Sequence, residues 1–349
     1  MSAEVTGSVD IKTGEVKKPA VGPIIGPGLL MPLALSASPP PAPPRASSIK
    51  PATEGLRFSP ICAANLTTKA YYRALLLGEP GSGKTICSLM TLPPDFYPLA
   101  VVDHDNKDAS MPELRPFIDD GRIVIYPINE PLMDVEWMIE KAKTADAGEI
   151  KHFMLPRGFI KAVEITNYLM GFTREAKVDR EAGVFPVYRT LVHDTLSRMA
   201  EHIERTTEFV QKSIGLAGWG DWEKYRAYLE EFFDNAVVQA PMHVIVNCHI
   251  YENVKKGKAG NETSYWTPAI NGKMRKKMLS YFNEAYLLKT TRGAQGAVNY
   301  VMRTKKTDVV PARTNIVGLG EEVKQDLGVI IGMWKKQMGF DEVGMTGEK

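Results

Sequence analysis

The stretch that decides the fold is GEPGSGKT, from Gly78 to Thr85, and the apolar run ALLL at 74–77 leads straight into it. It is a complete G-x-x-x-x-G-K-[ST] phosphate loop between a strand-like and a helix-like segment. Glycines let backbone N–H groups curl around an anion, Lys84 can reach the β- and γ-phosphates, and the Thr85 hydroxyl can bind Mg²⁺. The sequence therefore predicts a site for a nucleoside triphosphate. We expect its contacts from Gly78, Glu79, Pro80, Gly81, Ser82, Gly83, Lys84, Thr85 and Ile86.

Composition sets the broad class of the protein. The chain has 349 residues, of which 44% are apolar, and this is enough for a substantial core. Its 43 basic and 41 acidic residues give a net charge of +2, which argues against a histone-like coating protein and leaves any nucleic-acid contact to a local patch. Cys62, Cys87 and Cys248 are odd in number and widely spaced, as in a protein of a reducing compartment.

The first 58 residues differ in composition from the rest of the chain. They hold 10 of the 24 prolines, which favours an extended arm over a packed unit. The arm is either a flexible tail or a segment that docks on a neighbouring subunit through Ile24-Ile25 and Leu29-Leu30-Met31. Residues 19–37 imitate a signal peptide, but Pro23, Pro27 and Pro32 interrupt them. Because no apolar run reaches the roughly 18 residues of a membrane span, we expect a cytoplasmic protein without a membrane partner.

After the arm, strand-like and helix-like segments alternate, and this favours a single α/β domain over 59–336 followed by a flexible tail at 337–349. A mostly parallel sheet covered by helices on both faces follows from that order. Residues 147–185 resist a strand–helix interpretation and suggest a helical insert. We expect a polar loop at 249–268. The expected strands are 70–77, 99–103, 122–128, 188–193, 244–248, 284–289 and 299–303, and the expected helices are 83–92, 134–145, 195–212, 221–238, 272–280 and 321–336.

Two acidic positions follow expected strands and suit phosphoryl transfer, which depends on orientation and charge neutralisation. Asp194 ends the run TLVHD, as a metal-anchoring carboxylate does in Walker B segments, although an aspartate there is also a sound helix N-cap. Asp105, or alternatively Asp103, follows the second strand and can orient the attacking water as a general base. The alternative for Asp105 is a solvated loop aspartate beside Lys107 and Asp108.

The order of these motifs, followed by a strand that ends in Asn247-Cys248-His249, resembles the RecA-like ATPases of bacteriophages. More narrowly, it is similar to the phage nucleotide-binding AAA proteins, which include small RecA-related single-strand annealing proteins. The resemblance covers residues 70–316 without the insert. It implies a RecA-like P-loop fold, with Asp105 in the place of a catalytic glutamate and His249 as a sensor of the γ-phosphate. Cys248-His249 departs from the RecA pattern, and a satisfied, partly buried histidine is the alternative for His249.

In the RecA class, the loop after that strand contacts single-stranded DNA. Here Lys255, Lys256 and Lys258 can contact phosphates, and Tyr251 or Trp266 can stack on bases, although a solvated surface loop explains them equally well. Lys273 and Arg275 lie in a short basic segment. One of them can act as a finger that reaches the γ-phosphate of a neighbouring subunit, or both can extend the DNA patch. Arg313 is a further finger candidate by resemblance alone.

These observations predict a Mg²⁺-dependent ATPase that couples ATP hydrolysis to single-stranded DNA binding in phage recombination, annealing or replication. We expect a homo-oligomer in the host cytoplasm, with a protein partner for the arm. One alternative is a motor or helicase-type ATPase that acts on duplex DNA. Another is a non-hydrolysing module in which the bound nucleotide controls the binding of a partner.

Overall fold

The computed structural model describes residues 70–130, 140, 156–206, 219–256, 262–293, 296–307 and 309–340. The expected arm at 1–58, the helix expected at 134–145 apart from residue 140, the start of the insert, Lys258 and most of the tail lie outside these residues. No helix in the described ranges is long and apolar enough to cross a membrane.

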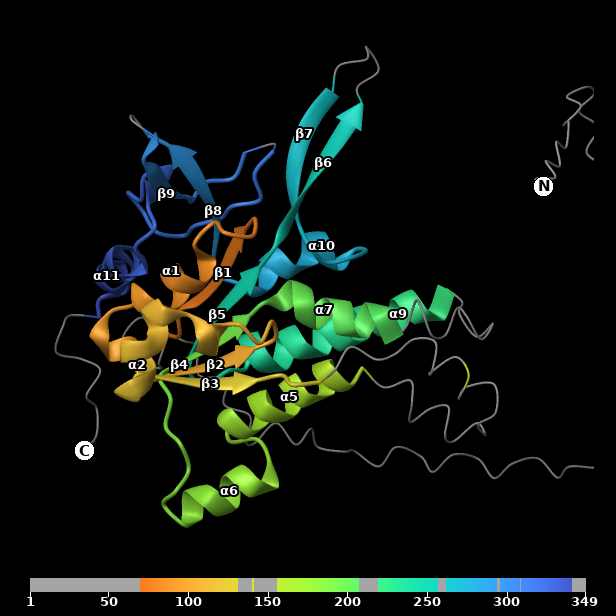
Figure 1. The fold of residues 1–349 in the computed structure, drawn as a ribbon, viewed down its shortest axis with the longest axis vertical. Coiled ribbons are helices and arrows are strands. Elements are labelled where there is room, and N and C mark those ends of the chain that lie inside the picture. The colour runs from red at the N-terminus through yellow and green to blue at the C-terminus, as the bar shows by residue number, and fades with distance from the viewer. Residues whose placement is uncertain are drawn as a thin grey trace, which may run out of the picture. The chain divides into compact units, whose positions relative to one another are not determined.

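A single sheet organises the fold, with strand order β10-β9-β8-β1-β5-β4-β2-β3 (Figure 1). The strands from β3 to β8 in this order pair in parallel, whereas β9 and β10 add antiparallel strands at one edge. β1, which ends at the phosphate loop, lies between β5 and β8. The strands are β1 Arg73–Gly78, β2 Leu99–Asp103, β3 Ile123–Pro127, β4 Thr190–Asp194, β5 His243–Cys248, β8 Glu284–Arg292, β9 Val298–Arg303 and β10 Glu322–Lys324.

Helices cover both faces of this sheet, as the sequence predicts. The helices are α1 Lys84–Met90, α2 Arg115–Asp119, α5 Arg157–Leu169, α6 Arg174–Glu181, α7 Leu196–Glu204, α9 Trp219–Phe232, α10 Met274–Lys277 and α11 Leu327–Met338. A π-helical segment, Phe233–Val238, continues α9. Short 3₁₀ turns occur at Pro94–Phe96, Asp108–Ser110, Pro112–Leu114 and Met278–Tyr281.

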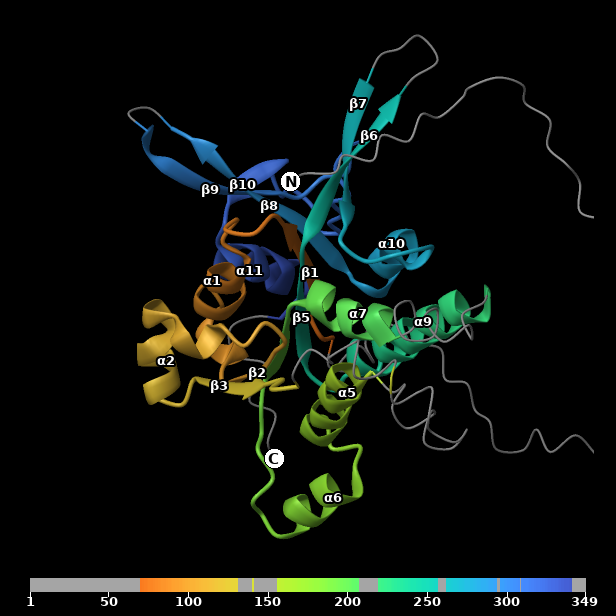
Figure 2. The same cartoon turned by 45° about the vertical axis from the view of Figure 1, so that its right-hand side comes forward.

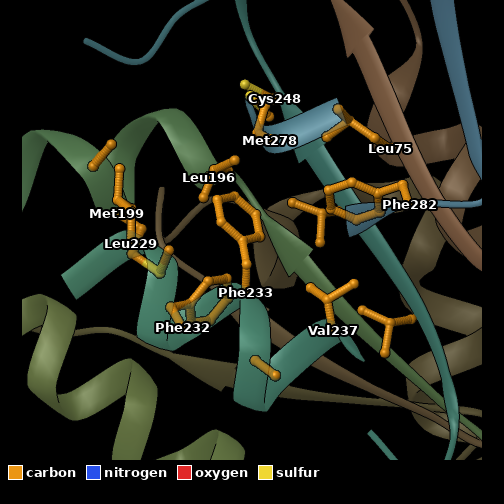
Figure 3. Packing of buried hydrophobic residues seen from close by; sticks show 14 of the residues in the cluster. Leu75, Leu196, Met199, Leu229, Phe232, Phe233, Val237, Cys248, Met278 and Phe282 are labelled. Atoms are coloured by element: carbon orange, nitrogen blue, oxygen red, sulfur yellow. The ribbon is translucent and has the colours of Figure 1, made fainter. Parts of the chain in front are cut away.

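The central strands are buried on both sides, because helices cover both faces of the sheet. Successive side chains of a strand point to opposite faces and therefore join different clusters. Leu75 and Leu77 belong to the cluster packed against α5, α7 and α9, whereas Ala74 and Leu76 belong to the cluster packed against α1 and α11. Figure 3 shows the first cluster, in which Leu196 and Met199 of α7 lie beside Leu229, Phe232 and Phe233. Cys87 and Cys248 are buried with 1% and 0% of their surface exposed, as expected for small apolar residues. The expected mostly parallel α/β fold is confirmed.

The prediction of a polar loop at 249–268 is wrong, because this segment forms a β-hairpin. Its strands are β6 Ile250–Lys256 and β7 Glu262–Pro268, paired in register from Ile250 with Pro268 to Lys256 with Glu262. The hairpin extends away from the sheet in two views (Figures 1 and 2). Because both of its faces meet solvent over much of its length, its sequence lacks the apolar–polar alternation of a half-buried strand. Its β-branched and aromatic residues on either side of the glycines at 257 and 260 are the sequence signal for the hairpin.

The helix expected at 321–336 begins later than its sequence suggested. Residues 322–324 form β10, and α11 begins at Leu327 after Asp326, whose side chain accepts the backbone N–H of Val329 at 3.3 Å. An aspartate N-cap explains this start. In the expected insert, α5 begins directly after Pro156, and its residues Phe159, Ala162 and Leu169 join the core. The described part of the helix expected at 195–212 is α7 and two π-helical residues after it.

Candidate functional site

The phosphate loop follows β1 and has the backbone that its glycines allow. Gly81 and Gly83 have φ angles of 77° and 90°, in the left-handed region that favours glycine. The Nζ atom of Lys84 donates to the carbonyl oxygens of Gly78 and Glu79 at 2.8 Å each, which holds the lysine across the loop. Burial lowers the pKa of Lys84 to about 8, and the negative charge of Asp194 opposes that effect. Lys84 thus lies inside the curl of the loop, where a phosphate would replace backbone carbonyls as its partner.

Thr85 and Asp194, which are 109 residues apart in the chain, meet at the carboxyl edge of the sheet. The Thr85 hydroxyl donates to Oδ2 of Asp194 at 2.6 Å. The Oδ1 atom of Asp194 is buried and has no hydrogen-bond partner among the described residues. A hydroxyl and a carboxylate oxygen with free acceptor capacity are hard oxygen ligands of the kind Mg²⁺ requires. The residues therefore fit a magnesium ion bound with a nucleotide.

The alternative role of Asp194 as a helix N-cap is wrong. The N-cap of α7 is Thr195, whose Oγ1 accepts the backbone N–H of Arg198 at 3.4 Å. The Asp194–Thr195 peptide is cis. Asp194 is the last residue of β4, and its side chain is left for the phosphate loop.

Asp103 and Asp105 have different surroundings at the end of β2. The carboxylate of Asp103 accepts the backbone N–H groups of Asp105 at 3.1 Å and Asp108 at 2.9 Å, and so closes the turn that follows the strand. Asp105 instead accepts from the Nζ of Lys107 at 2.8 Å and from the hydroxyl of Thr195 at 3.5 Å, with 20% of its side chain exposed. Of the two carboxylates, Asp105 is the one that borders an open pocket.

That pocket has a volume of about 910 Å³ and begins at Pro80 of the phosphate loop. Asp105, His249, Arg198 and Tyr251 also line it. The backbone N–H of His249 donates to the hydroxyl of Ser197 at 2.9 Å, which ties the end of β5 to the first turn of α7. Burial, followed by the nearby charge of Lys84, lowers the pKa of the His249 imidazole. His249 thus lines the same pocket as Pro80 of the phosphate loop, and its role as a γ-phosphate sensor stays a prediction.

The remaining predicted residues lie at varying distances from this centre. Lys255 and Lys256 end strand β6 of the hairpin. Lys273 is the exposed N-cap of α10, and Arg275 donates to the carbonyl oxygen of Ile270 at 2.9 Å. Arg313 forms an isolated bridge with Ala285, near the amino end of β8, whereas the phosphate loop lies at the carboxyl edge of the sheet. The structure therefore does not bring Arg313 to the phosphate loop of its own chain.

Asp108 is a buried acid that sequence reasoning missed. It is fully buried, and within the described ranges neither carboxylate oxygen has a hydrogen-bond partner. Burial, reinforced by the charges of Asp194 and Asp103, raises the pKa of Asp108 well above its usual range. Nothing in the run NKDAS distinguishes this aspartate from a solvated one.

Tyr300 and Gln325 also escaped the sequence analysis, because they reach the phosphate loop from the far end of the chain. The Nε2 atom of Gln325 donates to the carbonyl oxygen of Ser82 at 2.9 Å and to that of Val301 at 3.1 Å. A Cβ atom at Gly83 would lie 3.0 Å from Cδ1 of Tyr300, so the tyrosine ring lies against the loop. Both residues line a second pocket of about 540 Å³, formed by residues of the paired strands β9 and β10 and by Gln325.

Comparisons with known proteins give a family and distant structural likenesses. Among solved structures, a KaiC-like protein from Pyrococcus horikoshii is 11% identical with a TM-score of 0.34, and the match covers 70% of this chain and 83% of that one. The RadB recombinase is 12% identical with a TM-score of 0.29, and the match covers 67% and 87% of the two chains. An ATPase of a bacterial type III secretion system is 12% identical with a TM-score of 0.30, and the match covers 62% of this chain and 51% of that one. Likenesses at this level do not extend to function.

No match was found among curated proteins. A family model described as an AAA domain matches residues 70–316, which is more than half of the chain and includes the phosphate loop, Asp105, Asp194 and His249. The chain therefore belongs to this family of AAA domain proteins.

Proposed function

We propose that this protein is a Mg²⁺-dependent ATPase that couples ATP hydrolysis to the binding of single-stranded DNA. One observation carries the hydrolytic part of the proposal: the Thr85 hydroxyl lies 2.6 Å from Oδ2 of Asp194, beside the enclosed ammonium of Lys84. A P-loop hydroxyl, a strand-end carboxylate and a lysine that share one site are the groups phosphoryl transfer needs.

Each residue has a distinct task in this proposal. Lys84 exchanges its carbonyl partners for the β- and γ-phosphates, while Thr85 and Asp194 hold the magnesium ion. The bound ion neutralises charge on the phosphates. Asp105 accepts hydrogen bonds from the attacking water in the pocket next to Pro80, and His249 contacts the γ-phosphate from the end of β5.

The pocket lined by β9 and β10 supports the proposal that the nucleoside binds next to the phosphate loop. It begins where Tyr300 lies against Gly83, and so it adjoins the backbone that holds the phosphates. The Tyr300 side chain is 48% exposed, which leaves its ring accessible for stacking on a base.

The aromatic residues of the hairpin support the proposal that it binds single-stranded DNA. Its register places Tyr251, Asn253, Tyr265 and Thr267 on one face, and Asn253 donates to the Thr267 hydroxyl at 2.7 Å on that face. The opposite face carries Glu252, Val254 and Trp266, and Trp266 is partly buried against the hydrophobic core. Sequence-independent binding uses aromatic rings on which bases stack. We therefore assign the DNA strand to the tyrosine face, which by register also includes position 255. Lys255, Lys256 and Lys258 are the proposed phosphate contacts.

The resemblance to phage annealing proteins extends the proposal to a role in phage recombination, annealing or replication in the host cytoplasm. We propose a homo-oligomer, because single-stranded DNA is longer than one hairpin, and a protein partner for the proline-rich arm. Lys273, Arg275 and Arg313 remain candidates for a finger that reaches the nucleotide of a neighbouring copy. The position of Arg313, away from the phosphate loop of its own chain, is compatible with that task.

The deciding experiment measures ATP turnover with Mg²⁺ in the absence of DNA, with single-stranded DNA and with duplex DNA, across a salt series. We expect turnover that single strands stimulate, with stimulation that weakens as salt rises. Stimulation by duplex alone would indicate a duplex motor, and a flat baseline in all conditions would indicate a non-hydrolysing module.

Two variants locate the chemistry. Lys84→Ala should abolish turnover, and continued hydrolysis by this variant would contradict the site. Asp105→Asn should retain nucleotide binding and slow hydrolysis by roughly 10²–10⁴-fold, as expected for a lost general base. An unchanged rate would move that role to another residue.

A further inference from the structure

Helix α7 begins two residues after Asp194. Two arginines, one in its first turn and one just after its last residue, both contact the carboxylate of Glu201. Nη1 of Arg198 lies 2.6 Å from Oε2 of Glu201, and Nε of Arg205 lies 2.9 Å from Oε1 of the same residue. The side chains of Arg198 and Arg205 are 28% and 37% exposed. Ion pairs at such partly exposed sites add little to stability. One arginine would therefore suffice to keep Glu201 paired.

The two arginines differ in their distance from the phosphate loop. Arg198 lies in the first turn of α7, and its backbone N–H contacts the hydroxyl of Thr195, which in turn donates to Asp105. Arg205 lies seven residues later, about 10 Å farther along a helix. Both line the pocket of about 910 Å³, but Arg198 is the one next to Thr195 and Asp105.

At the phosphate-loop end of this pocket, Arg198 is the lining residue with a permanent positive charge. His249 and Asp105 line this end together with Pro80. Asp105 is already neutralised by Lys107 at 2.8 Å, so it does not compete for Arg198. A guanidinium group offers a planar fork of donors that matches two phosphate oxygens at once.

From this arrangement we propose that Arg198 contacts the γ-phosphate of the nucleotide held by the phosphate loop, exchanging Glu201 for phosphate oxygens. Arg205 stays on Glu201 and keeps the carboxylate paired during the exchange. Arg198 is thus a cis-acting residue that distinguishes a triphosphate from a diphosphate. This inference rests on the proposed nucleotide site.

The test compares Arg198→Gln with Arg205→Gln, a matched control that loses an ion pair to the same carboxylate. Calorimetric titrations with Mg²⁺ measure the affinity of each variant for a non-hydrolysable ATP analogue and for ADP. Arg198→Gln should weaken binding of the analogue by roughly 10–100-fold and leave ADP binding unchanged, because a charge-assisted contact to one phosphate is lost. Arg205→Gln should bind both ligands as the wild type does. Arg198→Lys should fall in between, since it keeps the charge but not the fork.

The inference is overturned if Arg198→Gln loses the analogue and ADP equally, which marks a structural role, or if the two glutamine variants behave alike. It is also overturned if Arg198→Gln binds both ligands as the wild type does, and in that case the nucleotide site itself stands. A wild-type protein that binds neither ligand would overturn the proposed function and this inference together.

Discussion

Oδ2 of Asp103 accepts the backbone N–H of Asp108 at 2.9 Å, and this bond shapes the turn after β2 so that the Asp108 side chain is fully enclosed. An acid in this position is ordinarily paired or neutral. Burial and the neighbouring carboxylates raise the pKa of Asp108, so the folded chain holds its proton to a higher pH than the unfolded chain does. Stability should therefore fall as pH rises above about 4, the pKa of an aspartate in an unfolded chain.

Replacing Asp108 by Asn removes this penalty while keeping the shape of the side chain. We expect Asp108→Asn to raise the free energy of unfolding by about 1–3 kcal/mol at pH 8, and by less at pH 5. Urea unfolding at the two pH values measures the difference. Asp105→Asn, at a partly exposed acid, is the control and should change stability little. An equal gain for Asp108→Asn at both pH values would contradict the prediction.

Tyr300 offers a test of where the nucleoside lies. A Cβ atom at Gly83 would lie 3.0 Å from Cδ1 of this ring, so the ring is close to the loop. Tyr300→Ala should weaken ATP binding by roughly tenfold or more, as expected when a stacked base loses its platform. Binding of inorganic triphosphate should not change, because that ligand has no base. Tyr300→Phe keeps the ring and should bind ATP as the wild type does. Equal losses for ATP and triphosphate would indicate that the alanine variant distorts the loop.

The two faces of the hairpin should differ in their contribution to DNA binding. Tyr251 and Val254 are 59% and 53% exposed and lie on opposite faces of β6. Tyr251→Ala should weaken single-stranded DNA binding by roughly 5–100-fold, which corresponds to the loss of one stacked base, whereas Val254→Ala should not. Fluorescence anisotropy with a labelled oligonucleotide measures both. Similar affinities for the two variants would argue against the tyrosine face.

His243 gives the folded chain a predictable sensitivity to acid. Its ring stacks on Phe96 with 3.9 Å between centroids, and its Nδ1 atom accepts the backbone N–H of Tyr72 at 2.9 Å. Burial lowers the pKa of His243 to about 4, so the unfolded chain binds the proton first, and stability is lost as pH falls from about 6.5 towards 4.

His243→Gln removes this proton-binding difference and retains an acceptor. Between pH 7 and 5, we expect the variant to lose about 2 kcal/mol less unfolding free energy than the wild type. His104, His193 and His202 also have lowered pKa values through burial, so the variant should keep part of the dependence of the unfolding free energy on pH. Urea unfolding over this range measures it, and parallel curves for the two proteins would count against a neutral His243.

The sequence predicted the sheet well because its strands are short apolar runs bounded by helices. The run 99–103 agrees with β2 residue for residue, and the phosphate loop identified β1. The hairpin and β10 were missed for a physical reason: both lie at exposed positions, where burial does not impose a pattern on the side chains. The start of α11 could have been found from Asp326, which precedes an apolar run as N-caps do.

The candidate site was predictable where a local motif marks a strand end. Lys84, Thr85 and Asp194 follow apolar strands, and parallel strands bring their carboxyl ends to one edge. Gln325 lies 243 residues from Ser82, whose carbonyl oxygen it contacts, and no local sequence pattern predicts a contact between residues so far apart in the chain. Asp108 and Arg198 differ from ordinary surface residues only through their surroundings in the folded chain.

The length of the hairpin has a mechanical consequence. Strand β6 begins at Ile250, next to His249 in the pocket beside the phosphate loop, and runs for seven residues to Lys256. Such a strand is about 23 Å long, so each degree of tilt at its base displaces the far end by about 0.4 Å. The hairpin is thus a lever whose fulcrum borders the phosphate-loop pocket, and it would magnify small rearrangements there into ångström-scale movements of the surface assigned to the DNA strand.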